Sequence, residues 1–348
     1  TTAISQSCII LQYILQILVL YIFRSFEAYL LCRILAESIQ WIIIEIVCRK
    51  KYGNIIKNKA EIDQETTFEL KKNIKAMFMH KIGYVLVNAV DGIVISAFVG
   101  VVALGEYSNY TTILSSMNGI LLLVFTSLTS IVGHMFVIEN IETSKLYCDA
   151  FHLLNFIIGM VFFMGYYAII DNLIAFFFSA ELVVSKDISA VIAINGFVQF
   201  MRRSILLFKD ATGQFYGDRW KPLFEGICNI VLSFLFVNLI GISGVIVATI
   251  ITNILICHIV EPYVLFKNAF YMSPKQYYFR NYLMISIFIF SIFFYNKISL
   301  NINNNLLELL ANGCLSVVIS VVVCSLICII NKKTIISSIK LFREDKNE

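Results

Sequence analysis

Charged residues are scarce in this chain. Asp, Glu, Lys and Arg make up only 14% of the 348 residues, whereas 59% are hydrophobic and the mean hydropathy is +0.82. So few polar side chains cannot coat a water-soluble globule of this length. The composition therefore predicts a protein whose solvent is mostly lipid.

Motifs of metal and catalytic chemistry are also missing. The nine cysteines form no CxxC pair and lie in or beside apolar runs, which is typical of small packing residues. The chain has no HExxH, Walker or GxSxG motif, and its four histidines fall in different apolar runs. We therefore expect no enzyme activity, no cofactor and no metal centre.

Basic residues do not form a nucleic-acid groove. The net charge is only +4, and no basic tract is interleaved with aromatic residues. Nucleic acid is therefore excluded as an expected partner.

Long apolar runs occupy most of the chain. A span needs roughly 20 apolar residues to cross about 30 Å of hydrocarbon, and backbone groups in lipid must satisfy one another, which selects helices. We predict an all-α polytopic membrane protein with about ten transmembrane helices, near residues 3–23, 28–48, 77–100, 107–133, 148–170, 187–208, 222–240, 243–264, 281–296 and 306–330. The weakest boundary is the one at Gly241 and Gly244.

The Lys and Arg residues gather in every second gap between these runs. Alternate gaps and the C-terminal tail hold 22 of the 27, and the other gaps hold only Arg24, Lys186 and Lys297. The positive-inside rule then puts both ends of this chain on the cytoplasmic side of the cell membrane. The first residue is Thr1, and the first run lacks a signal-peptide pattern, so we expect residues upstream of it.

One long polar segment, residues 49–75, interrupts the apolar pattern. Its mixed charges flank isolated apolar positions, which predicts a cytoplasmic linker with an amphipathic helix on the membrane surface. A linker of this kind separates helical lobes in many transporters. An ordinary loop is the alternative.

Three of the predicted spans carry a polar stripe at helical spacing. The candidates for a substrate cavity are Lys81, Tyr84, Asn88 and Asp91 on the third span, Asn118 with Thr111, Ser115 and Thr129 on the fourth, and Asn195, Gln199, Arg202 and Arg203 on the sixth. Such stripes are either hydrogen-bonded seams between helices or the wall of a hydrated cavity. The charged members favour a cavity, because isolated charges in a dry bundle would need close partners.

Each charged candidate has two interpretations. Arg202 and Arg203 either extend to lipid phosphates or, with Lys81 at a similar depth, bind an anionic head group such as a pyrophosphate. Asp91, near mid-membrane, either couples transport to Na⁺ or protons or pairs with a basic side chain. Arg33 and Glu37, with Gln40 on the same face, are predicted to form a buried structural ion pair.

Two stretches resemble a known family. The segments HKIGYVLVNAVDGIVISAFVGVVALGEYSNYTTI (80–113) and FKDATGQFYGDRWKPLFEGICNIVLSFLFVNLIGISGVIVATI (208–250) are similar to polysaccharide repeat-unit (Wzx-like) flippases. These belong to the multidrug, oligosaccharidyl-lipid and polysaccharide exporter superfamily. Lys209 stands where the family commonly has Arg, before Asp210, Ala211, Thr212 and Gly213. It keeps the positive charge but not the paired hydrogen bonding, and it completes the cavity candidates.

The resemblance implies a two-lobed, inverted-V transporter that works by alternating access, with part of the first lobe missing from this sequence. The implied parts are the last two helices of the N-terminal lobe (1–48), the lobe junction (49–75), a six-helix C-terminal lobe (77–264), two accessory helices (281–330) and a cytoplasmic tail (331–348).

The implied function is movement of an undecaprenyl-pyrophosphate-linked oligosaccharide across the cytoplasmic membrane in capsule, exopolysaccharide or O-antigen assembly. Membrane lipids, a polysaccharide polymerase and chain-length machinery are the implied partners. A cation-coupled small-molecule exporter is the alternative. A membrane polymerase or glycosyltransferase could use Asp210 and Asp218, which lie in one predicted cytoplasmic loop. It is disfavoured because the external loops are short and no large catalytic loop or metal motif is present. An inactive fragment is a further alternative.

Overall fold

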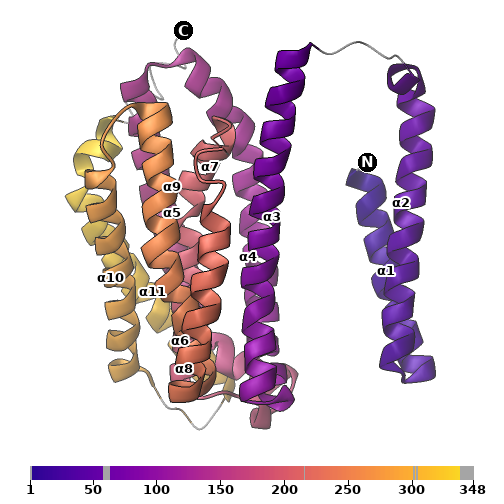
Figure 1. Ribbon diagram of the computed structural model, residues 1–348. Coiled ribbons are helices and arrows are strands. Elements are labelled where there is room, and N and C mark those ends of the chain that lie inside the picture. The colour runs from indigo at the N-terminus through magenta and orange to yellow at the C-terminus, as the bar shows by residue number, and fades with distance from the viewer. Residues whose placement is uncertain (1, 58–62, 215, 301, 303–304, 338–348) are drawn as a thin grey trace. The chain divides into compact units, whose positions relative to one another are not determined.

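The computed structural model describes residues 2–57, 63–214, 216–300, 302 and 305–337. These residues form helices joined by short turns, and no strand occurs among them (Figure 1). The chain divides into two units, Thr1–Phe68 and Glu69–Glu348. The all-α prediction is confirmed for the part of the chain that the structure describes.

Unit 1 contains a helical hairpin. Helix α1 (Thr2–Phe23) and helix α2 (Phe26–Lys57) are joined at Arg24, whose φ of 48° turns the chain. The hydroxyl of Ser25 then accepts a hydrogen bond from the backbone N–H of Ala28 at 3.2 Å, which satisfies a free donor at the start of α2. Two Gln side chains of α1, Gln12 and Gln16, are buried in this hairpin, whereas many of its apolar side chains are exposed.

The polar segment 49–75 is not a separate surface helix in its described residues. Its first part extends α2 to Lys57, and its last part belongs to α3 (Gln64–Phe98). Residues 58–62 lie outside the described residues. Lys, Glu and Gln favour helix formation, so charged helix ends can continue beyond an apolar span. The boundary between the two units falls within this segment.

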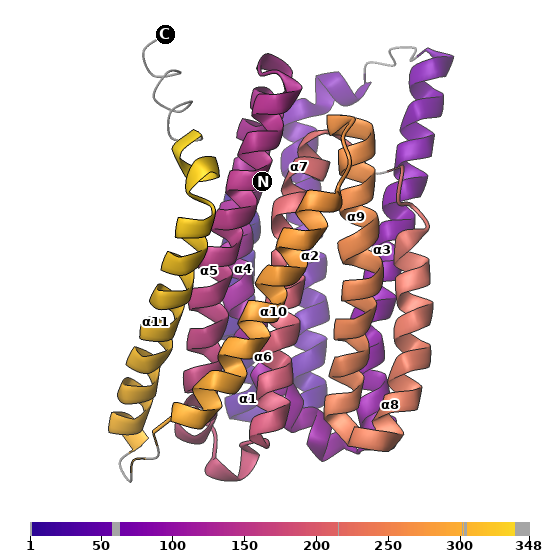
Figure 2. The same ribbon diagram turned by 90° about the vertical axis from the view of Figure 1, so that its left-hand side faces the viewer.

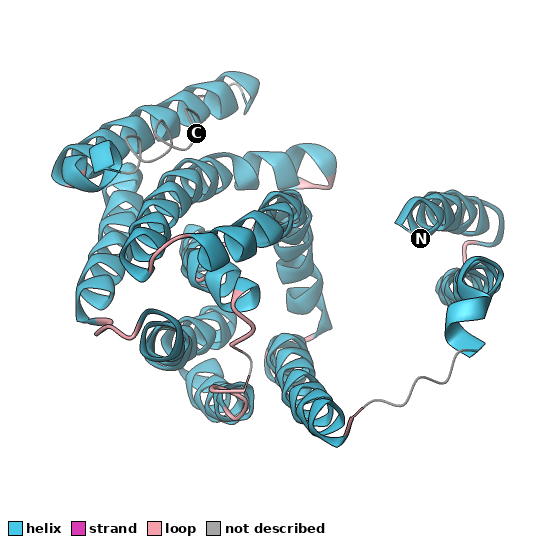
Figure 3. Ribbon diagram, turned by 90° about the horizontal axis from the view of Figure 1, so that it is seen from above, coloured by secondary structure: helices cyan, strands magenta, loops and turns pink. Residues whose placement is uncertain are grey.

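Unit 2 is a helical bundle (Figure 2). Its long helices after α3 are α4 (Val101–Ile138), α5 (Ile141–Phe177), α6 (Lys186–Met201), α7 (Arg203–Ala211), α8 (Lys221–Thr252), α9 (His258–Leu265), α10 (Lys275–Ile298) and α11 (Asn305–Ile330). Figure 3 shows the helices of this unit from above, packed side by side. Its most buried long apolar stretches are Ile141–Phe177, which is α5, and Lys186–Ala211, which contains α6 and α7. Helix α5 packs against both α6 and α11, and α6 packs against α8.

Helix α8 contains a sharp turn at the predicted boundary between two spans. Ile240 and Gly241 leave helical geometry, with a φ of 59° at Gly241, which suits a residue without Cβ. The two arms then fold against each other so closely that a Cβ on Gly244 would lie 2.2 Å from the carbonyl oxygen of Phe236. The structure therefore has a sharp turn at the boundary that the sequence predicts between two spans.

The second arm of this hairpin is irregular. A π-helical turn, Asn253–Cys257, precedes α9, and a second one, Phe266–Phe270, follows it. Pro262 lies inside α9 and cannot donate the usual backbone hydrogen bond. Turns of this kind are frequent at functional sites because they redirect side chains and leave backbone groups for other partners.

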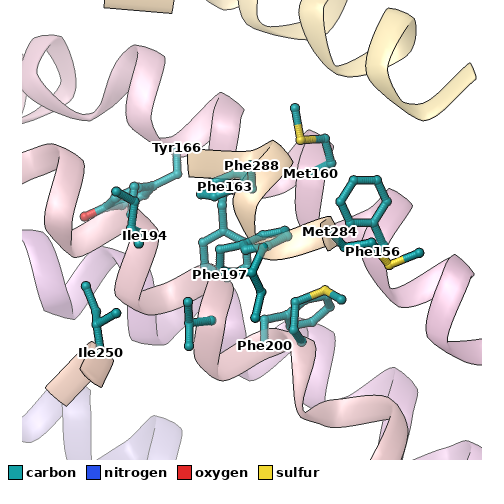
Figure 4. Close-up of a cluster of buried hydrophobic side chains, with 14 of the residues drawn as sticks. Phe156, Met160, Phe163, Tyr166, Ile194, Phe197, Phe200, Ile250, Met284 and Phe288 are labelled. Atoms are coloured by element: carbon teal, nitrogen blue, oxygen red, sulfur yellow. The ribbon is translucent and has the colours of Figure 1, made fainter. Parts of the chain in front are cut away.

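Aromatic side chains fill the core of unit 2 (Figure 4). Phe163 of α5, Phe197 of α6 and Phe288 of α10 are each fully buried, and the rings of Phe197 and Phe288 stack with centroids 3.8 Å apart. Gly159 and Gly196 make room for these rings, since a Cβ on Gly196 would lie 2.6 Å from the ring of Phe163. The core thus fixes α5, α6 and α10 as one packed body.

Seven helical stretches of the described residues are long and apolar enough to cross a membrane: Ile4–Phe23, Val101–Ile138, Ile141–Phe177, Lys186–Ala211, Lys221–Phe270, Lys275–Ile298 and Leu306–Ile330. The number of spans predicted from the sequence, ten, is larger than this number for three reasons. Helix α2 carries Arg33, Glu37 and Glu45 in its apolar part, the count takes in only the fully described part of α3, Ala89–Phe98, and the turn at Gly241 divides Lys221–Phe270.

Candidate functional site: polar groups on and within the helices

The α3 stripe is only partly described. Lys81 has an exposed side chain, and Asp91 is buried. The side chains of Tyr84 and Asn88, both cavity candidates, lie outside the described residues, so their roles stay predictions. Lys81 and Asp91 therefore differ in environment, although both belong to α3: the first is exposed and the second is buried.

Asp91 is held by the hairpin of α8. The hydroxyl of Thr249 lies 3.1 Å from its carboxylate, and the amide of Asn229 donates to the Thr249 hydroxyl at 2.8 Å. Both partners are buried, and they come from opposite arms of the hairpin. No Lys or Arg pairs with Asp91 among the described residues. The interpretation as an ion pair is thus not supported, and Asp91 is a buried carboxylate with neutral partners.

Helix α4 exposes a row of small polar side chains along its length. We call it the α4 polar row, and it consists of Thr112, Ser115, Ser116, Thr126, Ser127, Ser130 and His134, all of them exposed. The hydroxyls of Ser116 and Thr126 donate to carbonyls of their own helix, at 2.8 and 3.0 Å. Each hydroxyl oxygen keeps lone pairs that can accept a hydrogen bond from a ligand. The row is therefore a surface of acceptors.

Asn118 lies where α4 meets α6. It is on the same face of α4 as Leu114 and Phe125, since these positions are separated by four and seven residues. Leu114 approaches Gly196 of α6, and the ring of Phe125 is 5.7 Å from that of Phe200. Asn118 is half-buried between these contacts.

Asn195 and Gln199 form a pair on α6. The Gln199 amide donates to the Asn195 carbonyl oxygen at 3.2 Å, and Gln199 is exposed on a helix that is otherwise largely buried. The pair therefore leaves polar groups of α6 accessible at Gln199.

A closed ring of buried charges lies at the C-terminal end of α6. The guanidinium of Arg202 makes two hydrogen bonds to Glu261, at 2.6 and 3.0 Å, and lies 3.9 Å from Glu225. The Lys221 ammonium contacts the same two carboxylates, at 2.7 Å from Glu261 and 3.0 Å from Glu225. Each cation thus faces both anions, and the four formal charges sum to zero. We call these four residues the charge ring.

The π-helical turn completes the shell around the charge ring. Asn253 accepts a hydrogen bond from Arg202 at 2.6 Å, and the Cys257 sulfur lies 3.5 Å from the Lys221 ammonium. Buried charges need such partners because moving an ion out of water costs on the order of several kcal/mol. In this conformation the guanidinium of Arg202 is therefore bound by protein carboxylates, and a phosphate could reach it only after these contacts open.

The other two basic candidates differ from each other. Arg203, the next residue, is half-exposed. Lys209 is buried and makes a very short contact with the buried carboxylate of Asp218 across the turn between α7 and α8. This ion pair closes the loop, in which Gly213 has a φ of 68° and Pro222 lies in the first turn of α8. Lys209 therefore has a structural partner in this turn.

Unit 1 has a polar groove of its own. The groove has a volume of about 440 Å³ and is lined by Ile9, Gln12, Tyr13, Gln16, Tyr29, Arg33, Glu37, Gln40 and Trp41. The predicted pair is present, with Arg33 Nε 2.9 Å from Glu37 Oε1. The prediction that it is buried is wrong, because both side chains are more than half exposed. The side-chain oxygen of Gln16, Oε1, is buried and has no hydrogen-bond partner among the described residues.

Sequence reasoning missed Glu225, Glu261, Thr249 and Asn229. The signal was present, since both glutamates fall inside predicted spans, where an ionisable group needs a partner. Lys221 and Glu225 are also four residues apart, the spacing of a helical ion pair. Nothing in the sequence indicates that Glu261, which lies 59 residues beyond Arg202, completes the ring.

The fold and these polar groups define an all-helical polytopic membrane protein. No family model, no curated protein and no solved structure matches the chain. The resemblance to polysaccharide flippases therefore stays a prediction.

Proposed function

We propose that this protein is a flippase that moves an undecaprenyl-pyrophosphate-linked oligosaccharide from the inner to the outer leaflet of the cell membrane by alternating access. The observation that carries the proposal is the α4 polar row. A membrane-spanning helix that exposes hydroxyls along one face suits contact with water or a polar ligand better than contact with acyl chains. Sugar hydroxyls can donate to such acceptors.

The groove of unit 1 has chemistry that suits the same substrate. Its Gln, Arg and Glu side chains supply donors and acceptors for sugar hydroxyls. Its Trp and Tyr rings can pack against the apolar faces of a sugar ring and offer a polar edge. The charges of Arg33 and Glu37 balance each other in this groove, so its polar surface favours a neutral, hydroxyl-rich cargo.

The pyrophosphate is assigned to the basic groups near the inner end of unit 2. Lys81 is exposed and Arg203 is half-exposed, so both are accessible from outside the packed core. Arg202 would join them only in a conformation in which the charge ring opens. A guanidinium suits a phosphate because its planar fork donates two parallel hydrogen bonds.

The test is rescue of a strain that lacks its own repeat-unit flippase. The chain would be expressed with its native upstream sequence, and surface polysaccharide would be measured together with the lipid-linked unit that accumulates inside. Restored polysaccharide with loss of the accumulated unit supports the proposal. A protein that is well expressed but leaves the unit on the inner leaflet contradicts it when the strain makes the protein's own repeat unit.

A variant pair links the outcome to the site. Gln199→Leu should reduce export by about tenfold. Leucine lacks the amide N–H and carbonyl groups with which the exposed Gln199 side chain can bind a polar ligand. Asn238→Leu is the matched control, since Asn238 is also exposed but lies beside the turn of α8 and bonds only to its own helix. Equal loss in both variants would point to a folding defect.

The second candidate function is a cation-coupled small-molecule exporter, and Asp91 favours it. A buried carboxylate whose neighbours are Thr249 and Asn229 is a group that can bind a proton or a Na⁺ ion. Asp91→Asn should abolish export that depends on an ion gradient and leave ion-independent lipid movement unchanged. Drug efflux that requires Asp91, without rescue of the polysaccharide, would favour the exporter.

A further inference from the structure

A second groove lies between the start of α10 and the end of α11. Its volume is about 560 Å³. It is lined by Gln276, Arg280, Ile329, Ile330, Asn331, Lys332, Lys333, Thr334 and Ile336. None of these residues was among the candidates for the transport site.

The groove is basic. Arg280, Lys332 and Lys333 contribute three cations, and no carboxylate of the described residues belongs to the lining. Arg280 makes a very short contact with Asp149, but this carboxylate is shared, because the Lys145 ammonium also lies 2.6 Å from it. The positive charge of the lining is therefore only partly balanced. The Nε atom of Arg280 is buried and has no hydrogen-bond partner among the described residues.

The uncharged lining residues suit a phosphate as well. Gln276 and Asn331 carry amide donors, and Thr334 carries a hydroxyl. Gln276 lies in the first turn of α10, a helix of 24 residues with no side-chain cap at its N-terminus. Backbone N–H groups of such a turn are free donors, and the helix dipole favours an anion there.

The position of the groove selects the source of that phosphate. Helix α11 ends at Ile330, where a 25-residue apolar stretch gives way to Asn331, Lys332 and Lys333, so the cations lie at the depth of lipid head groups. Ile329, Ile330 and Ile336 add an apolar wall beside them. A soluble anion would have no use for this wall, whereas a phospholipid presents an apolar chain next to its phosphate.

We propose that this groove binds the phosphate of an anionic glycerophospholipid from the leaflet that contacts the inner end of unit 2. The lipid phosphate accepts hydrogen bonds from the Lys and Arg side chains, and its acyl chain lies against the isoleucines. The site does not depend on the proposed transport function.

The test uses the full chain in nanodiscs that contain phosphatidylcholine and phosphatidylglycerol. Native mass spectrometry would measure how strongly phosphatidylglycerol is enriched among the lipids that remain bound. Replacing both exposed lysines, Lys332→Gln with Lys333→Gln, should reduce this enrichment about tenfold, because each Lys near the surface contributes to anionic lipid binding. Both side chains are exposed, so the fold should be retained.

The control removes the same charge outside the groove. Arg219→Gln with Lys267→Gln changes two basic residues that do not line it, and this variant should keep the wild-type enrichment. Equal enrichment in both double variants would overturn the proposal. Inorganic phosphate and pyrophosphate would be tested on nanodiscs of phosphatidylcholine alone. If either bound there in a manner that required Lys332 and Lys333, the site would be one for soluble phosphate, and the lipid assignment would be wrong.

Discussion

At the scale of single residues, the charge ring is the most constrained feature of unit 2. Arg202, Lys221, Glu225 and Glu261 are buried or nearly so, and each charge faces two opposite charges. Such an arrangement is balanced only when all members are present, because removal of one leaves an uncompensated buried charge. The ring also ties the C-terminal end of α6 to α8 and α9.

The first prediction concerns Glu261. Glu261→Gln should lower the free energy of unfolding by about 3–5 kcal/mol, because Arg202 and Lys221 would then share one remaining carboxylate. Thermal unfolding in detergent would measure the loss. Glu181→Gln is the control, since Glu181 is exposed in a short turn and should change stability by less than about 0.5 kcal/mol.

The double variant Arg202→Met with Glu261→Met sharpens this test. It removes one cation and one anion and leaves the pair of Lys221 and Glu225 balanced. It should therefore be more stable than Glu261→Gln alone, since apolar groups of similar volume often replace buried ion pairs without loss. A double variant as unstable as the sum of two single variants would contradict the idea of a balanced ring.

Another residue-scale prediction concerns the start of α3. The Asp63 carboxylate accepts hydrogen bonds from the side chain of Thr66 and from its backbone N–H, the latter at 2.9 Å, and these contacts hold the pKa of Asp63 below its usual range. A depressed pKa stabilises the folded helix end above the unfolded pKa, and the contribution is lost as the pH falls through the folded value. The protection of the Thr66 amide against exchange, relative to its intrinsic rate at each pH, should therefore fall below about pH 4. Asp63→Ala should show low protection of this amide at all pH values.

At the scale of elements, the α8 hairpin shows how a single glycine divides one helical segment into two arms. Gly241 supplies the positive φ, and Gly244 lets the arms approach. The Asn229 to Thr249 hydrogen bond then joins the arms and positions Thr249 beside Asp91. The hairpin therefore links the turn to the buried carboxylate of α3.

We predict that Gly244→Ala will be strongly destabilising. The added Cβ would lie 2.2 Å from the Phe236 carbonyl oxygen, and a backbone atom cannot move aside as a flexible side chain can. The free energy of unfolding should fall by more than about 2 kcal/mol, in the range of overpacked cores. Gly105→Ala is the control, because open space surrounds Gly105 within α4 and alanine favours helix formation. A stable Gly244→Ala variant would contradict the described packing.

At the scale of the whole molecule, the sequence predicted the helical class and most helix positions, because apolar length and charge placement act locally. It also predicted the Arg33 and Glu37 pair and the division at Gly241, which depend on near neighbours. It could not predict the partners of Arg202 and Lys209. These partners depend on how distant segments pack, and Glu261 reaches Arg202 only because the irregular arm of the hairpin brings α9 to α6.

The predicted topology has its own test. An impermeant thiol reagent applied to intact cells should label a cysteine introduced at Val183, near the outer end of α6, but not one at Gly213, in the basic turn. The reverse pattern would overturn the prediction that both ends of this chain are cytoplasmic. The native cysteines would be replaced by alanine or serine beforehand.

The most direct test of the central claim is translocation in reconstituted vesicles. The full-length protein would be incorporated with its own lipid-linked oligosaccharide in the inner leaflet, and a glycosidase added outside would report how much of the sugar crosses with time. We predict that cleavage rises well above that of protein-free vesicles, and that Gln199→Leu slows it while Asn238→Leu does not. Cleavage no faster than in protein-free vesicles, with correctly folded protein present, would contradict the flippase account.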